Sequence, residues 1–210
     1  MEITGQDALI VVDVQNDFCP GGALPVPEGD AVIPVILAIA GRFEHILLTQ
    51  DWHPRDHCSF ASSHVGRKPF DLDPVSGERL WPDHCVQGTH GAAIHAALQL
   101  PRAELILRKG FRQKVDSYSA FFENDHTTPT GLDGYAEESG FRRFFLAGLA
   151  FDFCVGFSAL DARRCGYEAV VIRDACRGID ADGSVAAMEA QLARAGVGLM
   201  SSRNLQHSDL

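Results

Sequence analysis

The chain has 210 residues, of which 46% are hydrophobic and 22% charged, and its formal net charge is −10. This length suits one α/β domain, residues 1–210, with a large buried core, and the ordinary composition argues against disorder. The acidic balance, with no run of Lys or Arg, argues against nucleic acid and anionic membranes as partners, because both attract clustered cations. No apolar run approaches the ~20 residues that a membrane span needs.

No basic stretch precedes an apolar core at the N-terminus, so no signal peptide is visible and we expect a cytoplasmic protein. The chain has six cysteines, none of which form a C-x-x-C pair: Cys19, Cys58, Cys85, Cys154, Cys165 and Cys176. Because the cytosol keeps thiols reduced, we expect free thiols, of which one or two have a special role.

The first predicted element is a strand over residues 7–14, a nearly continuous β-branched run typical of a strand buried on both faces. Asp13 lies at its end, and a carboxylate is unusual in an apolar strand. It either caps neighbouring loop amides or acts as an acid/base group. A loop rich in Pro and Gly follows, and residues 29–42 then have the apolar spacing of a helix.

A second buried strand is predicted over residues 45–50, and Asp51 and His53 follow it directly. Two residues apart in extended chain, their side chains project to the same side. One carboxylate and one imidazole begin a site for Zn²⁺, Fe²⁺ or Mn²⁺. His84 is the candidate third ligand, with His57 also near; the alternative is a solvated loop with incidental histidines.

Residues 51–90 form a long connection with little periodicity, and its density of His, Trp and Pro favours a functional loop. A short helix is predicted over 91–98 and a third strand over 104–107, followed by Lys109. Further helices are predicted over 132–140, 157–164 and 182–195. Further strands are predicted over 144–146, 169–172 and, weakly, 197–200. Together these elements predict an α/β fold, a doubly wound, mainly parallel six-stranded sheet with helices on both faces.

The most informative stretch is 148–155 (GLAFDFCV), a glycine turn between the fourth strand and the next helix. It places Cys154 at a predicted helix N-terminus, where the helix dipole favours the thiolate. Asp13, Asp51 and Lys109 likewise follow or end strands. Since sites in such sheets form beyond the carboxyl ends of the strands, this convergence indicates an enzyme.

Five motifs in this order resemble the nicotinamidase/pyrazinamidase branch of the isochorismatase-like cysteine hydrolases. They are 13–18 (DVQNDF), 49–54 (TQDWHP), 81–86 (WPDHCV), 109–110 (KG) with 118–121 (YSAF), and 148–155 (GLAFDFCV). The resemblance spans almost the whole chain. One departure is Phe151, where many relatives carry Thr.

The resemblance implies a catalytic triad of Asp13, Lys109 and Cys154 that hydrolyses nicotinamide, and pyrazinamide as well, in NAD salvage. In this scheme Cys154 attacks the amide carbon, Asp13 transfers protons, and Lys109 favours the thiolate. The resemblance also implies an oxyanion hole at the N–H groups of Ala150 and Cys154, with a cis peptide at Leu149-Ala150.

The resemblance further implies one divalent transition metal, with Zn²⁺ favoured over Fe²⁺ and Mn²⁺, on Asp51, His53 and His84. This metal would bind and orient the pyridine nitrogen of the substrate. His57 would be an extra ligand or a water-bridged partner. The implied pocket residues, whose alternative role is plain core packing, are Phe18, Leu24, Trp81, Tyr118 and Phe153.

Two other functions stay open at this stage. The first is another amidase of the same fold, although that branch generally lacks the Asp-x-His…His set. The second is a non-enzymatic zinc-stabilised binding protein, which is disfavoured because structural zinc sites are usually closed and rich in thiolate. The sequence leaves the oligomeric state open, a homo-oligomer included.

Overall fold

The computed structural model describes residues 1–205, and its strands form a six-stranded sheet in the order β3-β2-β1-β4-β5-β6. All neighbouring strands are parallel. The strands are β1 (Asp7–Val12), β2 (His45–Asp51), β3 (Leu105–Lys109), β4 (Arg143–Leu149), β5 (Glu168–Arg177) and β6 (Gly198–Met200). The predicted parallel, doubly wound sheet is therefore confirmed.

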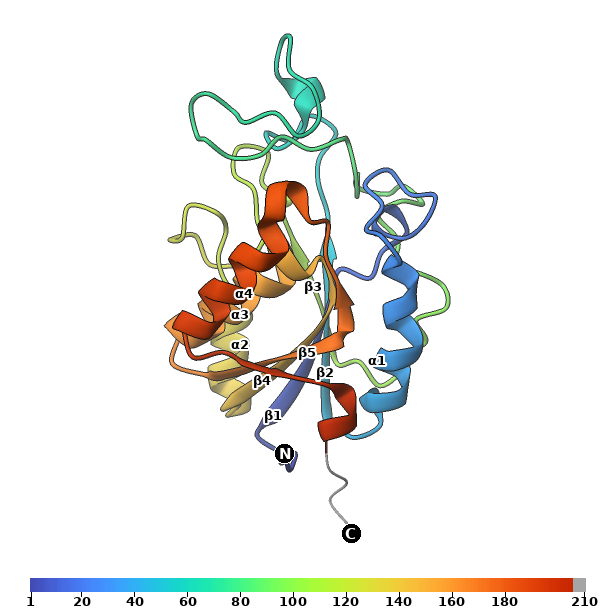
Figure 1. Ribbon diagram of the computed structural model, residues 1–210, viewed down its shortest axis with the longest axis vertical. Coiled ribbons are helices and arrows are strands. Elements are labelled where there is room, and N and C mark those ends of the chain that lie inside the picture. Colours follow the sequence, from blue (N-terminus) through green and yellow to red (C-terminus); the bar gives the residue numbers. More distant parts are fainter. Residues whose placement is uncertain (206–210) are drawn as a thin grey trace.

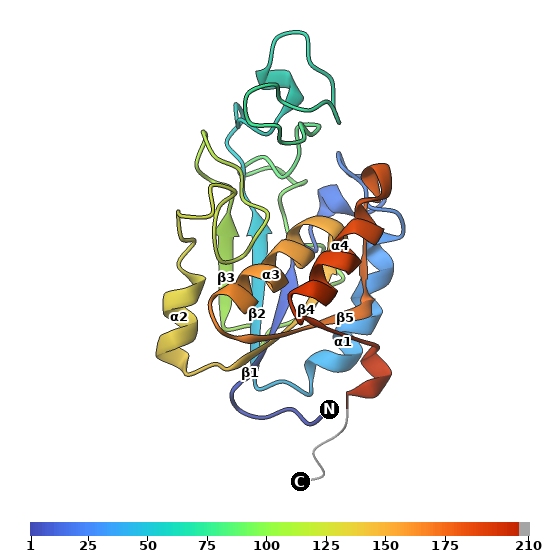
Figure 2. The same ribbon diagram turned by 60° about the vertical axis from the view of Figure 1, so that its left-hand side comes forward.

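Helices cover both faces of this sheet, as predicted. Helix α1 (Val32–Ala40) lies on one face, and α2 (Leu132–Ser139), α3 (Gly156–Arg164) and α4 (Ser184–Arg194) lie on the other (Figures 1 and 2). Strand β1 shows why its apolar run is unbroken. Leu9 and Val11 pack with α1, whereas Ile10 packs on the opposite face with α3 and α4. Within residues 1–205, no helix is long and apolar enough to cross a membrane.

The strand order changes direction between β1 and β4. The chain moves outward from β1 through β2 to β3, returns to β4 beside β1, and then moves outward again to β5 and β6. Connections leave β1 and β4 toward opposite sides, which opens a crevice at their carboxyl ends. The first part of the long connection between β2 and β3 rises above this end of the sheet (Figure 1).

The predicted helix over residues 91–98 is wrong, because this segment is a chain of turns. Its backbone pairs with the loop after β1 instead of with itself. The N–H groups of Asn16 and Asp17 each donate to carbonyls of residues 93 and 91 at 3.0 Å, and the N–H of His95 donates to Val14 at 2.9 Å. These bonds use the groups that a helix would pair internally.

Two other predicted helices are shorter than their apolar patterns. A 3₁₀ turn, Gly29–Ala31, precedes α1, and another, Ala181–Gly183, precedes α4. Asp180 and Asp182 have left-handed backbone, with φ of 57° and 54°, so α4 begins only at Ser184. Aspartate tolerates this conformation better than most residues, which explains its presence in the turn.

Candidate active site

Four strand ends place four polar side chains in one buried cluster. Asp13 follows β1, Asp51 ends β2, Lys109 ends β3 and Cys154 follows β4. Lys109 lies at the centre. Its Nζ is 2.9 Å from Asp13 Oδ2, 2.5 Å from Asp51 Oδ1 and 3.4 Å from Cys154 Sγ. The structure thus brings the three predicted catalytic residues together, with Asp13 and Lys109 fully buried.

Two further residues hold this cluster, Thr49 from one of the five motifs and Ser117, and neither was predicted to be a site residue. The Thr49 hydroxyl donates to Asp13 Oδ1 at 2.6 Å and accepts from the Asp13 N–H at 3.1 Å. The backbone carbonyl of Ser117 accepts a hydrogen bond from Lys109 Nζ at 2.8 Å. A role for Thr49 could have been predicted, since a polar residue in a buried apolar strand needs a hydrogen-bond partner. Ser117 acts through its backbone and leaves no sequence signal.

The charges in the cluster do not balance, because two carboxylates surround one ammonium. Burial opposes charge on Lys109, but Asp13 and Asp51 outweigh it and raise the pKa of the ammonium well above its usual value. Burial likewise opposes ionisation of Asp51, yet Lys109 and two imidazoles hold its pKa below the usual range. Asp13 receives less compensation, and burial raises the pKa of its carboxyl. A proton is therefore held more readily on Asp13 than on Asp51.

Cys154 was predicted to lie at the N-terminus of the helix after β4, but α3 begins two residues later. Cys154 lies inside a π-helical turn, Phe151–Val155, that precedes the helix. Burial raises the pKa of its thiol well above the ordinary value; Lys109 lowers it, while Asp13 and Asp51 raise it further. The net direction is thus opposite to the expected preference for the thiolate, because burial outweighs Lys109, which acts in the expected direction.

The turn around Cys154 also contains Ala150, the second residue of the implied oxyanion hole. The Leu149-Ala150 peptide is cis. The Ala150 carbonyl accepts hydrogen bonds from the N–H groups of Phe153 and Val155 at 3.1 Å each, which folds the turn around Cys154. Ala150 and Cys154 both line the same pocket, so the structure brings these two residues together as well.

Asp51, His53 and His84 form a second buried group, and they contribute ligand atoms that lie within 4.8 Å of one another. His53 Nε2 is 3.4 Å and His84 Nε2 3.8 Å from the same oxygen, Asp51 Oδ2. Both rings are fixed from behind, because His53 Nδ1 donates to the Gly110 carbonyl and His84 Nδ1 to the Pro82 carbonyl, each at 2.8 Å. These bonds leave each Nε2 facing the carboxylate, as in metal sites where a carbonyl orients the imidazole.

The chemistry of this group fits a divalent transition metal. Burial lowers the pKa of His84 to about 4, so its Nε2 is neutral and can act as a ligand. Gly110 is needed beside His53, because it has a φ of +63° and a Cβ there would lie 2.4 Å from the His53 ring. One carboxylate and two imidazoles match the ligands of Zn²⁺, Fe²⁺ and Mn²⁺.

His57 lies beside this group and not within it. Its ring centroid is 4.2 Å from that of His53, and it forms a second buried cluster with Asp116 and His53, so that the two clusters share His53. Both of its nitrogens have protein partners, since Nδ1 is 2.7 Å from the Ser59 hydroxyl and Nε2 is 3.2 Å from the Val115 carbonyl.

Both groups open into one pocket whose walls are mainly aromatic. The Trp81 and Phe153 rings meet edge to face at 4.9 Å, and Trp81 Nε1 donates to the Tyr118 hydroxyl at 3.1 Å. Such walls suit a flat ring. The lining comprises Asp51, His53, His84, Ala150, Cys154 and all five predicted pocket residues, together with two residues that were not predicted, Asp116 and Ile179.

The family follows from a comparison with known proteins. A model of the isochorismatase domain matches residues 7–203. The chain belongs to the isochorismatase family. This family membership confirms the resemblance drawn from the five motifs, and four residues of those motifs, Asp13, Asp51, Lys109 and Cys154, meet at the carboxyl end of the sheet.

Within the isochorismatase family, the chain is 50% identical over 200 residues to the nicotinamidase of Acinetobacter baylyi, covering 94% of each. A solved nicotinamidase/pyrazinamidase of Acinetobacter baumanii is 49% identical, with a TM-score of 0.95 over 97% of this chain and 99% of that one. A pyrazinamidase of Pyrococcus horikoshii, solved in complex with zinc, is 34% identical, with a TM-score of 0.76 over 93% of this chain and 99% of that one.

Proposed function

We propose that this chain hydrolyses nicotinamide to nicotinic acid and ammonia through a thioester on Cys154, in NAD salvage, and that it also accepts pyrazinamide. The observation that carries the proposal is the buried Asp13, Lys109 and Cys154 cluster, which opens into the same aromatic pocket as Asp51, His53 and His84. The relatives at 50% and 49% identity, named nicotinamidase and pyrazinamidase, support the choice of substrate.

The first half-reaction forms the thioester. Cys154 Sγ attacks the amide carbon while Asp13 accepts the thiol proton, so no thiolate need be present beforehand, in agreement with the raised pKa of the thiol. Asp13 then gives this proton to the amide nitrogen, the C–N bond breaks and ammonia leaves. Lys109 remains protonated beside Sγ and stabilises the negative charge that develops there.

The second half-reaction releases the acid. Asp13 accepts a proton from water as the water oxygen attacks the thioester carbon, the C–S bond breaks, and the proton returns to Sγ. In both halves the N–H groups of Ala150 and Cys154 stabilise the oxyanion that forms at the former carbonyl oxygen. The raised pKa of Asp13 suits a group that alternately accepts and donates a proton.

Asp51, His53 and His84 would hold the metal, with Zn²⁺ favoured by the zinc complex of the Pyrococcus horikoshii relative. When bound, it would supply a positive charge and an open coordination position for the pyridine nitrogen. The aromatic walls would hold the ring flat, so that its carboxamide reaches Cys154.

The deciding experiment compares nicotinamide with benzamide, in which a CH replaces the ring nitrogen. Ammonia release by the purified protein should be fast with nicotinamide. The kcat/KM for benzamide should be lower by up to ~10⁴-fold, because its ring has no nitrogen to occupy the open coordination position. Chelation should remove most activity, and Zn²⁺, Fe²⁺ or Mn²⁺ should restore it.

The matched variants are His84→Ala and His45→Ala, the second at the start of β2, where its ring contacts Glu104. His84→Ala should weaken metal binding and substrate capture together while Cys154 still alkylates, and His45→Ala should change neither. Equal turnover of benzamide and nicotinamide, or full activity after exhaustive chelation, would instead favour a metal-independent hydrolase of the same fold.

A further inference from the structure

The buried carboxylate of Asp152 lies two residues before Cys154, and no step of the proposed reaction uses it. Its side chain is only 2% exposed. Asp152 Oδ1 accepts a hydrogen bond from the Ile179 N–H at 2.9 Å, and Oδ2 accepts from the Asp180 N–H at 2.8 Å and from the Ser184 hydroxyl. All three donors belong to residues 178–184, which connect β5 to α4 and which we call the 178–184 connection.

The fit between Asp152 and this connection is close. A Cβ on Gly178 would lie 2.9 Å from Asp152 Oδ1 and 2.6 Å from a Val185 methyl group, so only glycine allows the backbone to lie on the carboxylate. Asp152 also lies at the N-terminus of α4, where the helix dipole favours a negative charge. The left-handed backbone at Asp180 and Asp182 needs such external partners to persist.

The residue whose N–H group Asp152 holds also forms part of the pocket wall. Ile179 lines the pocket together with Phe153 and Trp81, and it is the only pocket residue among those described after Cys154. A second contact fixes the same connection from the outer side, where Arg79 forms an ion pair with Asp182 at 2.9 Å. The position of the Ile179 side chain therefore depends on how the 178–184 connection is held.

We propose that Asp152 is a positioning residue that holds the 178–184 connection so that Ile179 forms the wall against the substrate ring. This inference rests on the proposed function and deepens it by assigning ring binding to a contact outside the catalytic cluster. Asp152 acts through Ile179 and touches no reacting atom. Its loss should therefore weaken substrate binding and leave the reactivity of the Cys154 thiol unchanged.

The test is a double-mutant cycle with Asp152→Asn and Ile179→Ala. Asp152→Asn keeps the side-chain size but turns one acceptor oxygen into a donor that faces another donor. Each single variant should raise the KM for nicotinamide about tenfold, with kcat within about threefold, because ring contact is lost. The double variant should be about as impaired as Ile179→Ala alone. Independent effects, which would multiply to about a hundredfold, would overturn the proposal.

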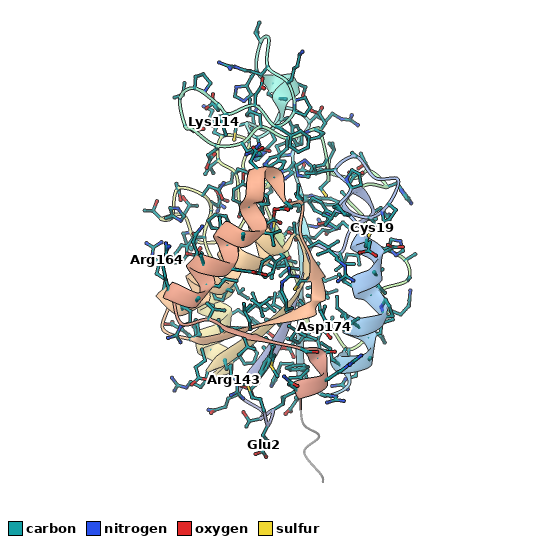
Figure 3. All side chains as sticks on the ribbon, viewed as in Figure 1. Glu2, Cys19, Lys114, Arg143, Arg164 and Asp174 are labelled. Atoms are coloured by element: carbon teal, nitrogen blue, oxygen red, sulfur yellow. The ribbon has the colours of Figure 1, made fainter. Side chains whose placement is uncertain are left out.

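The matched control is Asp174→Asn. Asp174, on β5 and labelled in Figure 3, also holds a connecting segment with three hydrogen bonds: it accepts from one backbone N–H and two hydroxyls of residues 201 and 202. This variant should leave KM unchanged. The rate of Cys154 alkylation should be equal in the wild type, Asp152→Asn and Asp174→Asn. A large fall in that rate in Asp152→Asn alone would mean that Asp152 shapes the nucleophile turn, and it would overturn the proposal.

Amide hydrogen exchange gives a readout that does not depend on the substrate. Exchange at Ile179 and Asp180 should accelerate in Asp152→Asn and stay slow in Asp174→Asn. If Asp152→Asn fails to fold, Ser184→Ala removes one donor, and it should raise KM two- to threefold and accelerate the same amides. Unchanged exchange at both amides would overturn the proposal, whereas inactivity of the wild type toward nicotinamide, with fast exchange in the variant, would overturn only the proposed function.

Discussion

Strand β1 has a buried aspartate at each of its two ends, and the two carboxylates have different surroundings. Asp7, which begins the strand, faces Arg143 at the beginning of β4. Arg143 Nε is 2.9 Å from Oδ1 and Nη2 is 2.6 Å from Oδ2, while the Thr4 N–H donates to Oδ2 at 2.7 Å. Figure 3 labels Arg143 at the end of the molecule opposite the loops that carry Lys114. Asp13, which follows the strand, shares Lys109 with Asp51.

The difference between the two ends is charge compensation. Asp7 has one guanidinium that binds both of its oxygens, and the second carboxylate near that guanidinium, Glu168 at 3.7 Å, is largely exposed to solvent. The charge of Asp7 is therefore matched, and such a bidentate pair fixes geometry. At the other end one ammonium serves two carboxylates and lies beside a thiol, and the pKa values of Asp13 and Cys154 are raised. The residue type and the burial are the same. The unmatched charge makes one end reactive, while the matched charge makes the other end structural.

The largest effect should come from Cys154→Ala at the reactive end. It should lower kcat for nicotinamide by at least ~10⁴, because the nucleophile is lost. Circular dichroism and thermal unfolding should show a retained fold, since replacing a small thiol by a methyl group costs little packing. The control is Cys165→Ala, which should keep most activity. Substantial turnover by Cys154→Ala would exclude the covalent mechanism.

Asp13→Asn should lower kcat by ~10³, because an amide cannot accept the thiol proton. The pH profile sharpens this expectation. Only the ionised carboxylate accepts a proton, so kcat/KM of the wild type should fall as the pH drops through the raised pKa of Asp13. This acidic limb should be absent from the residual activity of the variant. An identical limb in both proteins would assign it to another group.

Lys109→Met should have an effect of intermediate size at the reactive end, and it should act on the pKa of the Cys154 thiol. Since Lys109 lowers the pKa of Cys154, its loss should raise that pKa and slow alkylation by iodoacetamide at pH 8 about tenfold. The two carboxylates left without a cation should also destabilise the fold by about 3–5 kcal/mol. Alkylation rates against pH and urea unfolding measure the two effects. Matching alkylation profiles would show that Lys109 does not set the thiol pKa.

The smallest catalytic effect should come from Asp7→Asn at the structural end. It leaves Arg143 with only the exposed Glu168, 3.7 Å away, as a charged partner, and the free energy of unfolding should fall by about 3 kcal/mol. Values of kcat and KM should stay within about twofold of the wild type, because this pair lies at the opposite end of β1 from Asp13. Urea unfolding and nicotinamide kinetics test this together. A large fall in kcat with unchanged stability would contradict the separation of the two ends.

Much of the site could be predicted because the strands are easy to find. Asp13, Asp51 and Lys109 each end or follow an apolar run, and parallel strands bring their carboxyl ends to one edge. Continuous apolar runs therefore located these polar residues without any knowledge of the loops. The five aromatic and apolar pocket residues came from the resemblance, and they line the pocket in the structure.

The remaining features depend on contacts between distant segments, which a local pattern does not contain. The segment 91–98 has helical spacing, yet its backbone pairs with residues 14–17. The thiol pKa depends on how deeply Cys154 is buried and on two carboxylates from other strands. Asp152 stands in a motif that was already noted, but its partners are 27 to 32 residues away.

The position of Lys109 has a final consequence, which concerns how the site moves protons. Its ammonium has three N–H bonds, and they go to Asp51, the Ser117 carbonyl and the Cys154 sulfur. Asp13 Oδ2 lies 2.9 Å from the same Nζ but receives no hydrogen bond from the described residues. The ammonium therefore attracts the charge on Asp13 without occupying the oxygen that has to take the thiol proton. One cation can stabilise charge on Asp13 and on sulfur in turn, with little reorganisation to oppose the reaction.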